Sequence, residues 1–204
     1  MKYRGQLLNG KKEGTGTLIW PDGSIYIGEW KNDKAKGKGT LYHHSGDKYE
    51  GDFKNQKAHG SGKYTHSNGV IYMGNWIEDQ QDGKGKESYP DGSFYEGEYK
   101  NGERNGKGIY KTTNGSKYDG QWVKGQMEGF GIYTWSEGRI YEGEFKNNYM
   151  EGKGKYTWDD GRIYEGDYVK GKKHGFGKYK WADGKLYEGN WIEGKMESKL
   201  VNHT

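Results

Sequence analysis

The chain has 204 residues, and its 33 basic and 29 acidic residues nearly balance, which gives a formal net charge of +4 and a pI near 8.8. A mean hydropathy of −1.30 with 29% hydrophobic residues excludes a thick aliphatic core, and the small net charge argues against a disordered chain. The absence of cysteine excludes disulfides, thiolate metal sites and cysteine nucleophiles. The area available for burial is aromatic, from 8 tryptophans, 19 tyrosines and 5 phenylalanines.

The N-terminal sequence does not resemble a signal peptide, and no apolar run approaches the length of a transmembrane helix. The lack of cysteine also fits a reducing compartment. We therefore expect a soluble protein of the cytoplasm.

A tyrosine recurs every 23 residues from Tyr3 to Tyr187 without insertion or deletion, and it defines offset 0 of each repeat. Glycine follows at offset 2 in all nine repeats, at offsets 11, 13 and 20 in the eight complete ones, and at offset 7 in five, which accounts for all 38 glycines. The sequence thus predicts one repeat array over residues 1–204. Its eight full repeats start at residues 3, 26, 49, 72, 95, 118, 141 and 164, followed by a partial ninth repeat at 187–197 and a short tail at 198–204.

Each repeat carries the pattern of one β-hairpin. Offsets 0–6 alternate aromatic with polar residues or glycine, which predicts a strand. An Asn-Gly-Lys type of turn follows at offsets 6–10, then a second strand near offsets 11–17, then an Asp-Gly or Asn-Gly turn at offsets 19–20. No stretch has the periodicity of a helix.

The register depends on the first turn. If that turn is a four-residue loop, the ring at offset 4 lies opposite the glycine at offset 13, the glycine at offset 2 opposite offset 15, and the tyrosine at offset 0 opposite offset 17. Large rings would then lie over glycines on one face. The other face would pair glutamates at offsets 1 and 3 with lysines at offsets 12 and 14. We therefore expect a single-layer sheet with an aromatic groove and a charged back.

Two segments show the repeat clearly: YEGEYKNGERNGKGIYKTTNG (Tyr95–Gly115) and YEGDYVKGKKHGFGKYKWADG (Tyr164–Gly184). They resemble the consensus of the MORN (membrane occupation and recognition nexus) repeats, roughly YEGEW-x-NGK-x-HG-x-G, over residues 3–197. The resemblance implies an all-β fold: an elongated, curved, single-layer antiparallel sheet of consecutive hairpins. It also implies a role in assembly and localisation at the cytoskeleton, at a cilium, or at the cytoplasmic face of a membrane.

The residues that could suggest catalysis have simpler explanations. Gly5-x-x-x-x-Gly10-Lys11 and Gly166-x-x-x-x-Gly171-Lys172 mimic a phosphate-binding loop, but no Ser or Thr follows the lysine and both lie within a predicted hairpin. His43 and His66 share offset 17 one repeat apart, which is roughly 9–10 Å in a sheet and too far for a shared zinc ion. We expect no enzyme, no cofactor and no metal site.

Repeats five to eight hold the more continuous set of rings. Repeats two to four are less regular: they lack glycine at offset 7, and Glu87 stands at offset 15, where later repeats have tyrosine. Exposed aromatic surface indicates a binding site, so we predict a scaffold that holds an extended peptide or a helix of a partner protein. The alternative, that these rings only pack against neighbouring glycines, stays open. The predicted groove residues are Tyr110, Tyr118, Trp122, Tyr133, Trp135, Tyr141, Phe145, Tyr156, Trp158, Tyr164, Tyr179 and Trp181.

Residues 170–185 carry a net charge of +5, which suggests an alternative function as a phosphoinositide-binding membrane tether. Nucleic-acid binding is not expected, because the lysines form no continuous stripe. Both ends of the array lack a cap, so either open sheet edges mediate self-association or the tail Lys199–Thr204 covers one edge. The predicted contacts to anionic lipid are Lys170, Lys172, Lys173, Lys178 and Lys180.

Overall fold

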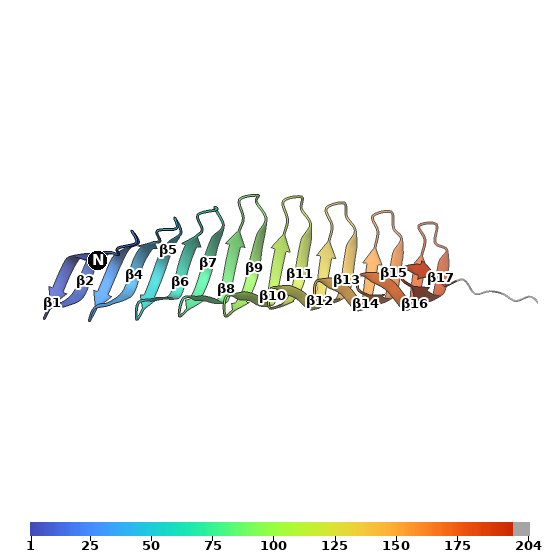
Figure 1. The fold of residues 1–204 in the computed structure, drawn as a ribbon. Coiled ribbons are helices and arrows are strands. Elements are labelled where there is room, and N and C mark those ends of the chain that lie inside the picture. Colours follow the sequence, from blue (N-terminus) through green and yellow to red (C-terminus); the bar gives the residue numbers. More distant parts are fainter. Residues whose placement is uncertain (198–204) are drawn as a thin grey trace, which may run out of the picture. The chain divides into compact units, whose positions relative to one another are not determined.

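The computed structural model describes residues 1–197, and in that part the regular secondary structure consists of β-strands alone (Figure 1). The tail at 198–204, predicted as a possible edge cover, lies outside the described residues. Two compact units, Met1–Arg104 and Asn105–Thr204, divide the chain. In each unit consecutive strands pair antiparallel in a single layer, which confirms the predicted hairpin repeats.

The first unit contains β1 (Lys2–Leu8), β2 (Lys11–Ile19), β3 (Ile25–Lys31), β4 (Lys34–Tyr42), β5 (Lys48–Lys54), β6 (Lys57–Thr65), β7 (Ile71–Ile77), β8 (Gln80–Ser88) and β9 (Phe94–Lys100). The boundary between the units falls within β10 (Glu103–Lys111). The second unit continues with β11 (Lys117–Val123), β12 (Gln126–Thr134), β13 (Ile140–Lys146), β14 (Tyr149–Thr157), β15 (Ile163–Val169), β16 (Lys172–Lys180), β17 (Leu186–Ile192) and β18 (Lys195–Met196).

The register within each hairpin differs from the prediction. In the sixth repeat Tyr118 pairs with Tyr133, and Gly120 pairs with Gly131. Offset 0 therefore faces offset 15, offset 2 faces offset 13, and offset 4 faces offset 9. The predicted partners, offsets 17, 15 and 13, were wrong.

The error lies in the first turn, which is a two-residue loop. Lys124 and Gly125 have φ values of +48° and +77°, as a type I′ turn requires. The strand after the turn therefore begins at offset 8, earlier than predicted. Extra residues then enter as a bulge around Gly129, whose φ is +71°, and the register shifts between Gly120 and Trp122.

Glycine faces glycine across the strands, and a tyrosine ring covers each such pair. A Cβ atom added to Gly28 or Gly39 would lie 2.5 Å from the hydroxyl oxygen of Tyr26. That hydroxyl donates a hydrogen bond to the carbonyl oxygen of Glu29 at 3.0 Å. The prediction that rings lie over glycines is thus correct, but the covering ring is the tyrosine at offset 0.

These tyrosines form a buried ladder with the rings at offset 4. The Tyr26 ring meets Trp30 of its own repeat edge-on at 5.1 Å and Phe53 of the next repeat at 4.9 Å. Such edge-to-face pairs contribute roughly 0.5–1.5 kcal/mol each beyond the area they bury. The ladder supplies the core that aliphatic residues do not, and its fully buried members are Tyr26, Tyr72, Tyr95, Tyr118, Tyr141 and Tyr164.

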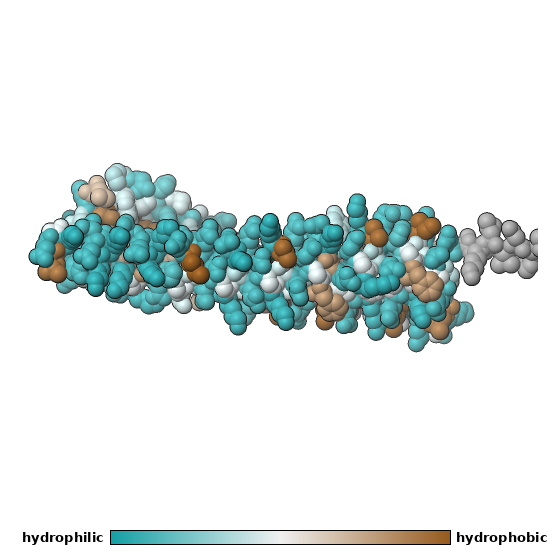
Figure 2. Space-filling view, turned by 90° about the horizontal axis from the view of Figure 1, so that it is seen from below, coloured by the Kyte–Doolittle hydropathy of each residue, from teal (hydrophilic) through white to brown (hydrophobic). Residues whose placement is uncertain are grey.

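The opposite face is charged, as predicted, and ion pairs on it join several of the repeats to the next one. Offset 12 pairs with offset 3 of the following repeat, as in Lys38–Asp52 at 2.6 Å. Offset 14 pairs with offset 1 of the following repeat, as in Lys86–Glu96 at 3.4 Å. Hydrophilic side chains cover most of the surface seen in Figure 2. Exposed pairs of this kind add little stability, so we assign the stability mainly to the ring ladder.

The two-residue turns also hold the repeats together. The amide of Asp79 donates to the carbonyl of Ala58 at 3.0 Å, and the Ala58 amide donates to the Asp79 carboxylate at 2.7 Å. Asp33 makes the same pair of bonds with Lys12 in the first repeats. Two of the missing glycines at offset 7 are therefore no irregularity, because Asp33 and Asp79 accept the positive φ there, 68° and 69°, and each adds a side-chain bond.

Candidate partner-binding groove

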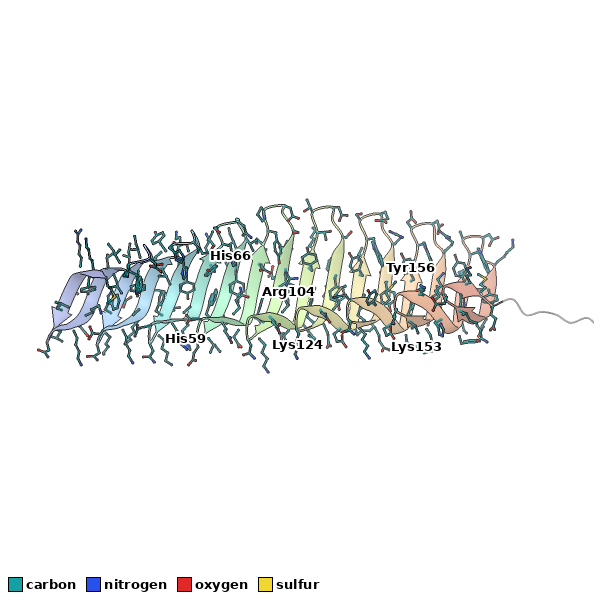
Figure 3. All side chains as sticks on the ribbon, viewed as in Figure 1. His59, His66, Arg104, Lys124, Lys153 and Tyr156 are labelled. Atoms are coloured by element: carbon teal, nitrogen blue, oxygen red, sulfur yellow. The ribbon has the colours of Figure 1, made fainter. Side chains whose placement is uncertain are left out.

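The accessible part of the aromatic face lies between the two ends of each hairpin. Offsets 15 and 17 lie toward the longer loops, while offsets 4, 7 and 9 lie toward the two-residue turns. Figure 3 shows Tyr156 and His66 on the loop side, whereas Lys124 marks the turn end of its hairpin. We call this surface, formed by offsets 4, 7, 9, 15 and 17, the ring groove.

The groove residues predicted in the second unit divide into two sets. Those at offsets 0 and 4 belong to the buried ladder, and two tyrosines at offset 15 are buried as well. The buried set is Tyr118, Trp122, Tyr141, Phe145, Tyr156, Tyr164 and Tyr179. A partner can reach only the half-exposed set, which is Tyr110, Tyr133, Trp135, Trp158 and Trp181.

The rings at offsets 15 and 17 follow one another as a continuous row. Trp135 lies 5.3 Å from Tyr156, and Tyr156 lies 4.4 Å from Trp158. The guanidinium groups of Arg139 and Arg162 lie 5.3 and 5.2 Å over Trp135 and Trp158. This packing holds the accessible tryptophans in fixed orientations.

Lys173 ends this row in an aromatic cage. Its ammonium lies over four rings at 4.5 to 5.0 Å, and no ion pair with a carboxylate is found for it within residues 1–197. Burial, together with the nearby positive charge of Arg162, lowers the pKa of Lys173 to about 8. The four rings are Trp158, Tyr164, Tyr179 and Trp191.

The lysines predicted to contact lipid do not gather on one face. Alternation along β16 directs Lys173 into the ring groove, while Lys172 and Lys178 lie on the opposite face and pair with Glu193 and Glu188. Lys180 shares that opposite face, and Lys170 lies in the two-residue turn. The geometry therefore gives the lipid-binding prediction no concentrated patch.

Glu87, which departs from the tyrosine found in later repeats, has a matching partner. Its carboxylate lies 2.9 Å from Nη2 of Arg104 and accepts a hydrogen bond from the hydroxyl of Tyr89 at 2.6 Å. The Arg104 guanidinium also lies 4.5 Å over the ring of Tyr95. Charged groups thus replace ring packing at this point of the groove.

In the first unit the groove contains a cavity of about 240 Å³ beside Ala58. This cavity was not predicted from the sequence, although alanine at offset 9, where most other repeats have a long side chain, was the available signal. A second hollow of about 340 Å³ reaches from Tyr64 to Asn101 and Gly102. The cavity beside Ala58 is lined by Leu41, His43, Tyr49, Phe53, Gln56, Ala58, Tyr64, Trp76 and Asp79.

Other surfaces offer less definite sites. The opposite face of the second unit has an open hollow with glycines at its floor, between the half-exposed rings of Phe130 and Phe176. The edge strand β1 exposes Leu7 and Leu8, and self-association through this edge remains a prediction. Within residues 1–197 no cluster of potential metal ligands is found. The same residues include no helix that could cross a membrane.

Comparisons with known proteins agree with this architecture. The family described as MORN repeat matches residues 3–25, 26–48, 49–71, 72–94, 95–117, 118–138, 141–161, 164–185 and 187–199. No curated protein matches the chain in sequence.

Solved structures with related folds include the TCP10 domain of Danio rerio CPAP. That domain has a TM-score of 0.50 at 10% sequence identity, covering 87% of this chain and 84% of that chain. The same domain in complex with a peptide of Danio rerio STIL has a TM-score of 0.27 at 10% identity, covering 93% of this chain and 100% of that chain. At 10% identity, the likeness to the first of these two structures shows the fold alone.

Proposed function

The chain belongs to the MORN repeat family, and we propose that it is a non-catalytic scaffold that binds an extended peptide or a helix of a partner protein along the ring groove. The observation that carries the proposal is the continuous row of rings at offsets 15 and 17 in repeats six to eight, in which Tyr133, Trp135 and Trp158 are half-exposed. By resemblance to the family, its setting is the cytoplasm, in a cytoskeletal, ciliary or membrane-proximal assembly.

The geometry of the row supports binding. Tyrosine and tryptophan dominate the affinity of most protein interfaces, and Trp135 and Trp158 are already held by neighbouring rings and by the arginines stacked on them. A partner that covers them pays little additional side-chain entropy. The ring row therefore suits the central contacts of an interface.

The titratable groups of the ladder support a structural role. Burial raises the pKa of Tyr72 and Tyr118 to about 12, so both stay protonated at neutral pH. Their hydroxyls donate to the carbonyl oxygens of Asn75 and Gln121. These tyrosines serve the fold and give a reaction neither a base nor a nucleophile.

The test uses the full chain as bait in affinity purification followed by mass spectrometry. Wild type is compared with Trp135→Ala/Trp158→Ala, and the matched control is Phe130→Ala/Phe176→Ala on the opposite face. We expect a partner that the control retains and the tryptophan variant loses, with an affinity reduced about thirtyfold or more in a direct titration of the purified pair. Equal retention by both variants would contradict the proposal.

The alternative function, a phosphoinositide-binding tether, makes a different prediction for the same protein. Binding to phosphoinositide vesicles that weakens as salt rises would favour it, because charge attraction at a surface is screened by salt. The scaffold proposal expects vesicle binding to be weak, and expects partner capture to be independent of Lys178 and Lys180.

A further inference from the structure

The position at offset 9 carries a cation in some repeats, and the surrounding rings hold it. In the eighth repeat this residue is Lys173, whose ammonium lies over three rings on β15, β16 and β17 and over the ring of Trp158, which follows β14. The rings come from offset 17 of the preceding repeat, offsets 0 and 15 of the same repeat, and offset 4 of the following repeat. Cation–π contacts of this kind are strongest where the cation is desolvated.

The third repeat has the same arrangement without the lysine. Offset 9 is Ala58, and the cavity of about 240 Å³ occupies the space that the Lys173 side chain fills in the eighth repeat. Three aromatic rings and one imidazole line it at the equivalent positions. They are His43 at offset 17, Tyr49 at offset 0, Tyr64 at offset 15 and Trp76 at offset 4 of the next repeat.

A carboxylate completes the cavity. Asp79, at offset 7 of the following repeat, is one of the lining residues and is held by the Ala58 amide. The equivalent carboxylate beside the first repeat is Asp33 of the second repeat, which lies 3.6 Å from the ammonium of Lys12, and that ammonium stands over Tyr3 and Trp30. The cavity of the third repeat thus combines a carboxylate, as at Lys12, with three of the four aromatic rings found around Lys173, and His43 stands where the eighth-repeat cage has Trp158.

We propose that this cavity, the Ala58 cage, binds a lysine side chain of the partner protein. The proposal rests on the proposed function and names the chemistry that one point of the ring groove recognises. In the eighth repeat the side chain of Lys173 fills the equivalent cage, whereas Ala58 in the third repeat places no cation of the chain at offset 9. Asp79, together with Asp47 at the hydroxyl of Tyr64, favours a positive charge over an apolar side chain.

The neighbouring repeat offers a matched control. Ala35 also stands at offset 9, and the amide of Gln56 donates to its carbonyl at 3.0 Å. Gln56 takes the place of the carboxylate, and Leu41 takes the place of the tyrosine at offset 15. The second repeat therefore lacks the charge and one of the rings, and we expect no lysine binding there.

The test is an NMR titration of the full chain with the peptide acetyl-Gly-Lys-Gly-amide, and with its norleucine analogue as the uncharged control. We expect saturable shifts of the Trp76 indole signal with a dissociation constant on the order of millimolar for the lysine peptide, and no saturation for the norleucine peptide. Ala58→Lys should abolish the shifts by filling the cage. Ala35→Lys should leave them unchanged.

Asp79→Asn keeps the cavity open and should weaken the lysine peptide roughly threefold, as loss of a solvent-accessible ion pair does. If Ala58→Lys lowers the melting temperature, the Asp79→Asn variant still tests whether the charge of the cavity contributes to lysine binding. Equal binding of both peptides, shifts that persist in Ala58→Lys with an unchanged fold, or no saturation by the lysine peptide would each overturn the proposal.

The outcome is separable from that of the scaffold proposal. The peptide titration needs no natural partner, so its failure leaves capture through Trp135 and Trp158 untouched. A positive titration together with capture that is insensitive to those tryptophans would retain the cage and reject the groove placement. Bait carrying Ala58→Lys, compared with Ala35→Lys, then shows whether a captured partner uses the cage.

Discussion

Replacing Gly131 by alanine tests the contact between glycine and ring on which the fold depends. A Cβ atom there would lie 2.6 Å from both Cε2 and the hydroxyl oxygen of Tyr118. The Tyr118 ring is 1% exposed and meets Trp122 at 5.2 Å and Phe145 at 5.0 Å. It cannot move aside without giving up packing in two repeats.

The expected cost follows from these contacts. Overpacking a filled site costs roughly 1–3 kcal/mol. Displacing the ring also breaks the hydrogen bond from the Tyr118 hydroxyl to the Gln121 carbonyl, 2.9 Å long, which contributes about 1 kcal/mol. Weakening one edge-to-face contact adds about 1 kcal/mol. Together these terms predict that Gly131→Ala lowers the free energy of unfolding by about 3–5 kcal/mol.

Urea denaturation followed by tryptophan fluorescence measures this change. In a Tyr118→Leu background the added Cβ meets no aromatic ring, so the further cost of Gly131→Ala should fall to about 1 kcal/mol or less. Gly125→Asn serves as a control, because nothing lies within 4 Å of that turn position and asparagine accepts its φ of +77°. Additive costs of the two substitutions would refute the ring-over-glycine explanation.

Two further predictions concern the charged groups of the ring groove. Arg104→Ala should lower the free energy of unfolding by about 2 kcal/mol in urea denaturation, because it removes the charge partner of the mostly buried Glu87. Arg104→Met combined with Glu87→Tyr, the pairing found in later repeats, should recover most of this loss. No recovery of stability would argue against a matched pair. Lys173 has a pKa of about 8 in the folded protein, against an ordinary value of 10.5. The unfolded state therefore binds more protons between these values, and wild type should gain stability over Lys173→Met as the pH rises from 8 to 10.5. A difference between the two proteins that does not change over this range would rule out the caged, desolvated ammonium.

The sequence allowed the faces of the sheet to be predicted correctly and their pairings incorrectly, for one physical reason. Side chains in a strand alternate with a period of two, so a register shifted by two residues leaves every side chain on the same face. Tyr118 was expected opposite offset 17 and lies opposite Tyr133 at offset 15. The bulge at Gly129 absorbs the difference, and the periodic pattern does not record it.

By itself the sequence determined the 23-residue period, the hairpin in each repeat, the aromatic and charged faces, and the need for glycine beneath large rings. Only the tertiary structure decided which rings a partner can reach, because the exposure of Tyr156 or Trp158 depends on neighbouring strands. The same holds for the Ala58 cage, whose walls come from three consecutive repeats, from Leu41 to Asp79. A substitution at offset 9 reads as a minor variation in the sequence, and becomes a cavity only when the rings of adjacent repeats surround it.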